Sequence, residues 1–182
     1  VSIYSGYSND WKHLIKLTGD CEPYEIDCNQ YGNILAFGSV VSTVAPPSFP
    51  PDFRQIKSGA FYIWKEENSN WILKNTITGT GFDFGKSISM DSLGNTIITS
   101  CTRAATVDGL YKSGQLTITT GNGEEWKINQ VLCADQLNDN FGHISKINKK
   151  GNRIFCSAWG GTTSSISFYH NKSKIHIYTG DK

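Results

Sequence analysis

The chain has 182 residues, of which 38% are apolar, and its 17 Lys and Arg against 16 Asp and Glu leave a net charge of +1. Without a net field to hold a nucleic-acid backbone or an anionic membrane, partners selected by bulk charge are excluded. Its apolar runs are far shorter than the ~20 residues that a membrane-spanning helix needs, so we expect one packed core and no membrane insertion.

Composition favours an all-β fold. The sequence has 18 Gly, one Met and 12% aromatic residues, which suits short strands joined by tight turns. Its 5 Cys are odd in number and lack CxxC spacing, so neither a complete disulfide framework nor a zinc ribbon is predicted. Cys101 and Cys156 lie in apolar runs and are expected to be buried thiols. We expect the cysteines to be free thiols, and a Cys21–Cys28 disulfide is the alternative.

An internal repeat organises the chain. An opening strand with its following tryptophan occurs at 1–11, 60–71 and 115–126, and another opening strand begins at 175. Gly-Asn turns recur with a similar spacing, at 32–33, 94–95 and 151–152. The period is about 55 to 62 residues, which is typical of repeat architectures. We divide the chain into repeats at approximately 1–59, 60–114 and 115–174, with a partial fourth at 175–182.

Each period contains four strand signals. In the second repeat, residues 71–77 alternate and form one predicted strand, and 86–90 form the next. A hairpin turn at 91–95 then leads into the apolar run 96–101, which we expect between two packed faces. A strand beginning at Leu116 follows a variable loop. Four antiparallel strands per period predict the blades of a β-propeller, about three of them, as part of a larger or oligomeric ring.

The order of these motifs resembles the FG-GAP repeat of integrin-α-type β-propellers. Phe-Gly occurs at 84–85 and 141–142, and Ser-Gly at 58–59 and 113–114, whereas the first repeat has Pro23-Tyr24-Glu25 in place of Phe-Gly. The resemblance implies that the Phe-Gly strand is innermost and the Trp strand outermost. The chain would then supply two strands, two complete blades and three strands, which is too little to close a ring. We therefore expect either further chain beyond both ends or association of copies.

The turns depart from the calcium-binding members of that family. The corresponding turns at 29–33, 91–95 and 148–152 hold at most one carboxylate each, and Lys149-Lys150 would repel a cation. Calcium needs six or more oxygen ligands, so we predict no metal, and no cofactor is indicated. Residues 89–96 also resemble a sialidase Asp-box, but they carry one residue too many between Asp91 and Gly94.

Three long loops, 39–58, 102–113 and 160–174, are expected to emerge on one face of the propeller. Long loops on a rigid scaffold often carry binding residues, and planar or forked side chains are favoured in recognition. The candidate binding residues on this face are Phe49, Phe53, Arg54, Arg103, Tyr111, Trp159 and Tyr169. Packing of these side chains on their own blades is the alternative. The repeated Trp11, Trp71 and Trp126 are expected to be structural.

Catalysis finds little support in the sequence. The four His residues lie on different segments, and no Ser or Cys has a recognisable nucleophile setting. The adjacent carboxylates Glu66-Glu67 and Glu124-Glu125 are expected to be solvated in hairpin turns. Asp135 and Asp139 could face the mouth of the propeller, but sequence cannot supply the geometry of a carboxylate pair.

These observations favour a non-enzymatic scaffold for protein–protein interaction, such as a segment of a surface adhesin or a virion component. The expected partner is another protein or further copies of the chain, in an extracellular, cell-surface or virion setting. A glycan-binding module is the alternative, with Trp159 or Tyr111 stacking on a sugar face. A hydrolase is the third and least favoured reading.

Overall fold

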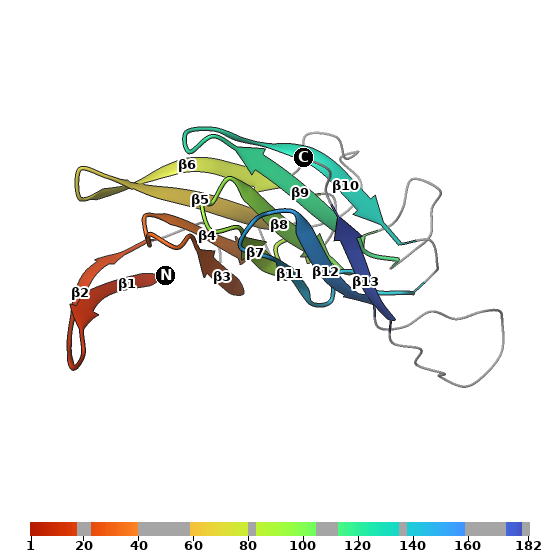
Figure 1. Cartoon of the computed structure of the whole chain (residues 1–182), viewed down its shortest axis with the longest axis horizontal. Coiled ribbons are helices and arrows are strands. Elements are labelled where there is room, and N and C mark those ends of the chain that lie inside the picture. Colours follow the sequence, from red (N-terminus) through yellow and green to blue (C-terminus); the bar gives the residue numbers. More distant parts are fainter. Residues whose placement is uncertain are drawn as a thin grey trace, which may run out of the picture.

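The protein is described from a computed structural model, which covers residues 1–17, 23–39, 59–79, 83–104, 113–134, 138–158 and 174–179. These residues form 13 strands and no helix (Figure 1). The strands are β1 (Ser2–Tyr7), β2 (Asp10–Lys16), β3 (Glu25–Cys28), β4 (Ile34–Ser39), β5 (Ala60–Glu67), β6 (Asn70–Thr78), β7 (Ile88–Met90), β8 (Thr96–Cys101), β9 (Gln115–Gly121), β10 (Trp126–Cys133), β11 (Ser145–Ile147), β12 (Arg153–Ala158) and β13 (Lys174–Thr179).

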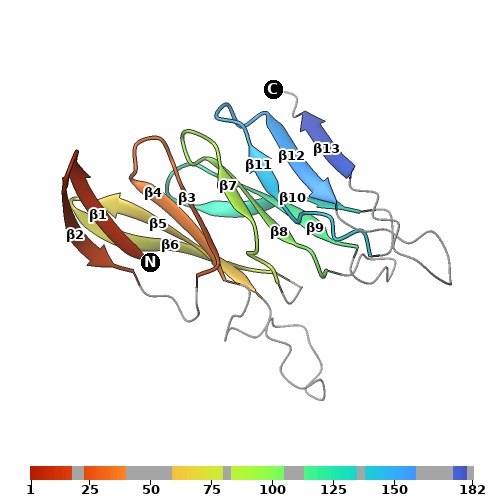
Figure 2. The same cartoon turned by 90° about the horizontal axis from the view of Figure 1, so that it is seen from below.

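The strands form four antiparallel sheets. Their strand orders are β1-β2, β3-β4-β5-β6, β7-β8-β9-β10 and β11-β12-β13. The predicted all-β class and the division into two, four, four and three strands are thus confirmed for the described residues. Figure 2 shows the sheets following one another in chain order, with β1 and β2 at one end and β13 at the other.

Three apolar cores lie between consecutive sheets. The first joins Leu17 and Ile3 to Phe37 and Tyr62, and it lies between sheets β1-β2 and β3–β6. The second and larger core lies between β3–β6 and β7–β10, and the third between β7–β10 and β11–β13. The sequence predicts that strand 96–101 lies between two packed faces, and β8 confirms it. Ile97 belongs to the second core and Ile98 to the third, and both are fully buried.

The Phe-Gly and Ser-Gly motifs meet between neighbouring sheets. The Phe141 N–H donates to the Ser113 carbonyl at 2.9 Å, and a Cβ added at Gly114 would lie 2.2 Å from the Phe141 carbonyl oxygen. A Cβ at Gly59 would likewise lie 1.7 Å from the Phe84 carbonyl oxygen. Only glycine permits this approach of two backbones. Both phenylalanine rings are buried in the cores that they enter.

The repeated tryptophans occupy one hairpin position but differ in burial. Trp126 is 3% exposed and donates its indole N–H to the Gly94 carbonyl at 2.9 Å. Trp71 is half-buried beside the first core, whereas Trp11 is 60% exposed. Each ring lies on the face of its sheet that is turned away from the following sheet. In β3–β6 and β7–β10 the preceding sheet packs on this face, whereas no described residue covers it in β1-β2. Burial thus supports the predicted structural role of Trp71 and Trp126, whereas Trp11 only donates its indole N–H to the Ser8 carbonyl of its own hairpin at 3.0 Å, and its role stays a prediction.

A β-bulge recurs in the strand that carries each tryptophan. The pairing of β1 with β2, β5 with β6 and β9 with β10 skips one residue of the second strand in each case. The skipped residues are Leu14, Lys74 and Asn129. A bulge increases the local twist and bends its strand, so these three strands deform at the same point of the repeat.

Charged side chains join the hairpins of the two central sheets. Lys74 Nζ lies 2.7 Å from Glu67 Oε1 and 2.8 Å from Glu124 Oε2, and Lys65 also pairs with both carboxylates. The hydrogen bond from Lys65 and then that from Lys74 lower the pKa of Glu124 from 4.5 to about 2. Glu67 and Glu124 are thus paired rather than simply solvated, which corrects the sequence-based expectation for these two residues.

Candidate functional site

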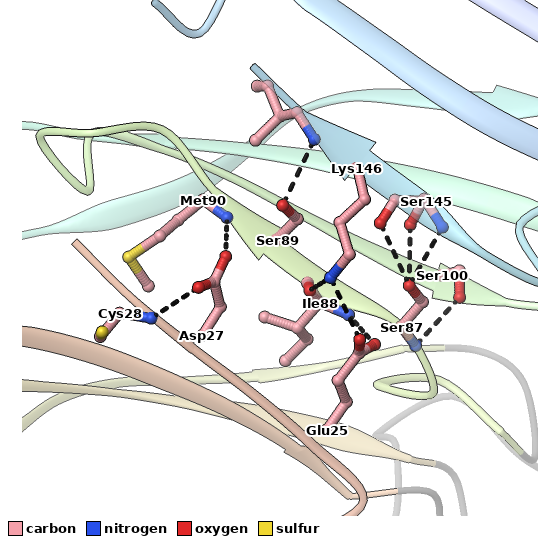
Figure 3. Close-up of polar contacts among 11 residues, drawn as sticks. Glu25, Asp27, Cys28, Ser87, Ile88, Ser89, Met90, Ser100, Ser145 and Lys146 are labelled. Carbon is pink, nitrogen blue, oxygen red and sulfur yellow. Dashed lines mark hydrogen bonds and ion pairs between the residues drawn. The ribbon is translucent and has the colours of Figure 1, made fainter. Parts of the chain in front are cut away.

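The edge strands β3, β7 and β11, which we call the inner strands, lie side by side and are joined by side chains (Figure 3). Glu25 Oε2 accepts a hydrogen bond from the Ile88 N–H at 2.6 Å. Asp27 Oδ2 accepts one from the Met90 N–H at 2.8 Å, while its other oxygen accepts from Cys28 N–H at 2.9 Å. Carboxylates of β3 therefore satisfy backbone donors at the edge of β7, which would otherwise lack partners.

The same relationship occurs one sheet further on. Ser87 Oγ accepts a hydrogen bond from the Ser145 N–H at 3.2 Å, and Ser89 Oγ accepts one from the Ile147 N–H at 3.3 Å. The hydroxyls of Ser89 in β7 and of Ser87 just before it thus accept hydrogen bonds from β11, as two carboxylates of β3 accept them from β7. These contacts fix the offset between consecutive sheets, and we call them the axial contacts.

Lys146 marks the end of this series among the described residues. It occupies the position in β11 that Asp27 and Ser89 occupy in β3 and β7, and an ammonium group cannot accept a hydrogen bond. Its Nζ instead lies 3.3 Å from Glu25 Oε1 and 3.5 Å from the Ile88 carbonyl oxygen. The three inner strands are therefore connected by one cation as well as by the paired donors and acceptors.

The hairpin turns beside these strands are held by their own amide side chains. Asn29 Oδ1 accepts from the N–H groups of Asn33 and Ile34, both at 3.1 Å. Asn148 Oδ1 does the same at 3.0 Å for Asn152 and Arg153. In the positions described, no group of three or more His, Cys, Asp or Glu side chains is placed to hold a metal ion. The oxygen atoms of these turns thus serve backbone donors.

The opposite edge of the stack carries the long connections. Ser39 pairs with Ala60, Cys101 with Gln115 and Ala158 with Lys174, and these three pairs occupy equivalent positions in their sheets. The segments 40–58, 105–112 and 159–173 therefore begin and end at the same end of the strands, opposite the hairpin turns, and we call this end of the stack the loop edge. The strand ends that flank the three predicted loops are thus equivalent, while the loops themselves lie outside the described residues.

Only one of the predicted binding residues is described. Arg103 is exposed at the loop edge, just after β8. The other six lie outside the described residues: Phe49, Phe53, Arg54, Tyr111, Trp159 and Tyr169. Arg103 is thus the one predicted binding residue whose exposure can be stated, and its role in binding stays a prediction.

A buried carboxylate, missed by the sequence analysis, anchors the chain at Arg103. Asp83 is 8% exposed and accepts hydrogen bonds from the Arg103 N–H at 2.9 Å, the Cys101 thiol at 3.2 Å and the Thr102 hydroxyl. Lys86 Nζ lies 3.9 Å from Asp83 Oδ2. Asp83 directly precedes the Phe84-Gly85 motif, and Asn140 has the same place before Phe141-Gly142, so a polar residue before Phe-Gly was the available signal.

The two buried thiols among the described residues, Cys101 and Cys156, lie in surroundings that keep them protonated. Burial raises the pKa of Cys101 well above its usual range, and the nearby Asp83 raises it further. Burial also raises the pKa of Cys156 to about 12, so both thiols are protonated at neutral pH and are poor nucleophiles. Asp139 is fully buried, which corrects the suggestion that it faces an open mouth, and Asp135 lies outside the described residues. The predicted burial of Cys101 and Cys156 is confirmed.

Comparison with known proteins gives a likeness in fold. No protein-family model and no curated protein matches the sequence. Among solved structures, the chain is similar to the X-ray structure of a hypothetical selenium-binding protein from Sulfolobus tokodaii, with a TM-score of 0.53 at 10% sequence identity. The match covers 81% of this chain and 35% of that chain, so this chain spans about a third of that protein. Within the described residues, none forms a helix long and apolar enough to cross a bilayer.

Proposed function

We propose that the four sheets are consecutive blades of a β-propeller segment related to the FG-GAP repeat. The support is the strand order, because each complete sheet runs from its inner to its outer strand in chain order. The axial contacts between β3, β7 and β11 add to this support, since neighbouring blades of a propeller meet along their inner strands.

In this proposal the chain is a non-enzymatic scaffold that binds another protein through the loop edge, within an extracellular, cell-surface or virion-type assembly. One observation carries it: three long connections leave the stack at equivalent strand ends. A rigid scaffold that presents several loops side by side lowers the entropy cost of binding, because the loop ends are already positioned. Arg103 contributes an exposed guanidinium to this edge, on backbone anchored by Asp83.

The test is site-specific photo-crosslinking of the full chain. One variant carries a photoreactive phenylalanine analogue at Phe49, in a long loop predicted from the sequence, and a matched variant carries it at Leu93, in a turn at the opposite edge. Both are irradiated with a surface-protein extract of the organism that expresses the chain. We expect a discrete adduct at Phe49 that excess unlabelled chain suppresses, and none at Leu93.

A glycan array with the parent chain and Trp159→Ala separates the alternative. Saturable binding that a monosaccharide competes, and that Trp159→Ala removes, would replace the protein-binding proposal with glycan binding. Equal adducts at Phe49 and Leu93, or adducts that the unlabelled chain does not suppress, would contradict a specific loop-edge partner. Substrate turnover over a panel of glycosides and esters, abolished by a single Asp or His change, would establish the hydrolase instead.

A further inference from the structure

Sheets in the middle of the stack bury both of their faces. We call the side of a sheet that packs on the next sheet in the chain its forward face, and the other side its backward face. In β3–β6 and β7–β10, apolar cross-strand pairs occupy the centre of the forward face: Ala36 opposite Ile63, and Ile98 opposite Ile118. Ala36, Ile63 and Ile98 are each 0% exposed. Each forward face is covered by the backward face of the following sheet.

The forward face of β11–β13 has the same pair, but no described residue covers it. Phe155 lies opposite Ile177 in the register in which Ile98 lies opposite Ile118. Phe155 is 41% exposed and Ile177 is 62% exposed, whereas Ala36, Ile63 and Ile98 at equivalent positions are buried and Ile118 is partly buried. The last sheet therefore presents the apolar surface that the two preceding sheets use to bind a neighbour.

At the other end of the stack, no residue that the structure describes covers the backward face of β1-β2. Trp11 is 60% exposed, whereas Trp126 at the equivalent position is 3% exposed. Tyr4 is 57% exposed and packs edge-on against His13, with ring centroids 5.2 Å apart. Tyrosine and tryptophan are the residues most enriched at the energetic centres of protein interfaces.

We propose that a second copy of this chain covers these faces, with the forward face of β11–β13 in one copy packed on the backward face of β1-β2 in the other. The chain builds the same forward-on-backward contact three times internally, as its three apolar cores. Its two exposed faces are one of each kind, so they are complementary. They lie at opposite ends of the stack, so the contact joins different copies (Figure 2).

Two strands are enough for such a contact. The forward face of the two-stranded sheet β1-β2 already supports the first core, through Ile3 and the flanking Val1 and Leu17. The proposed contact is heterologous, because it joins two different surfaces, and such contacts produce closed rings or open chains of copies. It goes beyond the proposed binding of another protein at the loop edge, since neither exposed face belongs to that edge.

The test compares the full chain with one variant for each face. We expect the unmodified chain to sediment as a dimer or larger assembly at micromolar concentration. Ile177→Asp removes the forward face and Trp11→Asp the backward face, and each should weaken self-association about tenfold or more. Leu93→Asp is the control, since Leu93 is 49% exposed in a turn outside both faces and should leave association unchanged.

Mixing the two variants tests the head-to-tail arrangement itself. Each variant retains the face that the other has lost, so at a concentration at which each alone is monomeric, a 1:1 mixture should form a heterodimer. Circular dichroism and thermal melting confirm that the variants are folded. A monomeric unmodified chain, undiminished association of either variant, or a mixture that stays monomeric would each overturn the proposal. None of these results affects photo-crosslinking at Phe49, so failure here is distinguishable from failure of the proposed function.

Discussion

Asn75 holds both backbone polar groups of Trp126 across the boundary between two sheets. Its Oδ1 accepts from the Trp126 N–H at 3.1 Å, and its Nδ2 donates to the Trp126 carbonyl at 3.2 Å. Asn75 lies on β6, the edge strand opposite β3 and so the outer strand of its sheet, and Trp126 begins the equivalent strand β10 of the next. This amide thus joins the outer strands of consecutive sheets, whereas the axial contacts join the inner ones.

Asn75→Ala should lower the free energy of unfolding by about 2 kcal/mol, because it removes two neutral hydrogen bonds worth about 1 kcal/mol each. Asn75→Asp keeps the acceptor for the Trp126 N–H but loses the donor, so its stability should fall between the two. Urea unfolding followed by tryptophan fluorescence measures all three proteins. Equal stability of the parent chain and Asn75→Ala would show that the amide pair contributes nothing.

Gly114→Ala should be strongly destabilising for two separable reasons. Gly114 has φ of +92°, and an added Cβ would also lie 2.2 Å from the Phe141 carbonyl oxygen. Gly123 has φ of +89° but no heavy atom within 4 Å of its Cβ position, so Gly123→Ala isolates the conformational cost at about 1 kcal/mol. We expect Gly114→Ala to cost about 3 kcal/mol or more in unfolding free energy. Similar losses in the two variants would contradict the close approach of Ser-Gly and Phe-Gly.

The charged cluster between the central hairpins should make stability depend on acid pH. The pKa of Glu124 is lowered in the folded chain to about 2, so its contribution is present above the ordinary value of 4.5 and is lost as the pH falls toward 2. The difference in urea midpoint between the parent chain and Glu124→Gln should therefore be full at pH 7 and vanish near pH 2. Glu125→Gln, at an exposed neighbour, is the control. A difference independent of pH would exclude the ion pairs as its source.

Thiol reactivity should separate the four described cysteines into two classes. Cys28 and Cys133 are exposed free thiols, whereas Cys101 and Cys156 are buried, and burial raises the pKa of all four. We expect maleimide to label Cys28 and Cys133 in the folded chain and to reach the buried pair only after unfolding in urea. Peptide mass spectrometry assigns the sites. Rapid labelling of Cys101 in the native chain would contradict its burial beside Asp83.

Much of the fold could be predicted from the periodicity of the sequence. The strand at 96–101 was predicted with its observed bounds, because continuous apolar character reports burial on both faces. Burial of the tryptophans could not be predicted equally well: Trp11 and Trp126 have the same place in the repeat, and only the neighbouring sheet distinguishes them. Local pattern specifies which way a side chain faces, whereas coverage depends on a segment far away in the sequence.

The candidate site was less accessible to sequence reasoning. Arg103 could be placed at the loop edge because its loop follows a clear strand, but Asp83, which anchors it, is 20 residues earlier and outside any loop considered. The ion pairs of Glu124 with Lys65 and Lys74 join hairpins of different sheets. Such contacts require the offset between sheets, which the axial contacts set and which no local pattern encodes.

Hydrogen exchange at Met90 tests most directly whether consecutive sheets stack through their inner strands. Met90 N–H donates to Asp27 across the boundary between β3 and β7, so its amide should exchange slowly in the parent chain. Asp27→Ala should accelerate that exchange, Asp27→Asn should largely preserve protection, and the Ile97 amide in β8 should be unaffected in both. Fast exchange at Met90 in the parent chain, or unchanged protection in Asp27→Ala, would contradict the stacked arrangement.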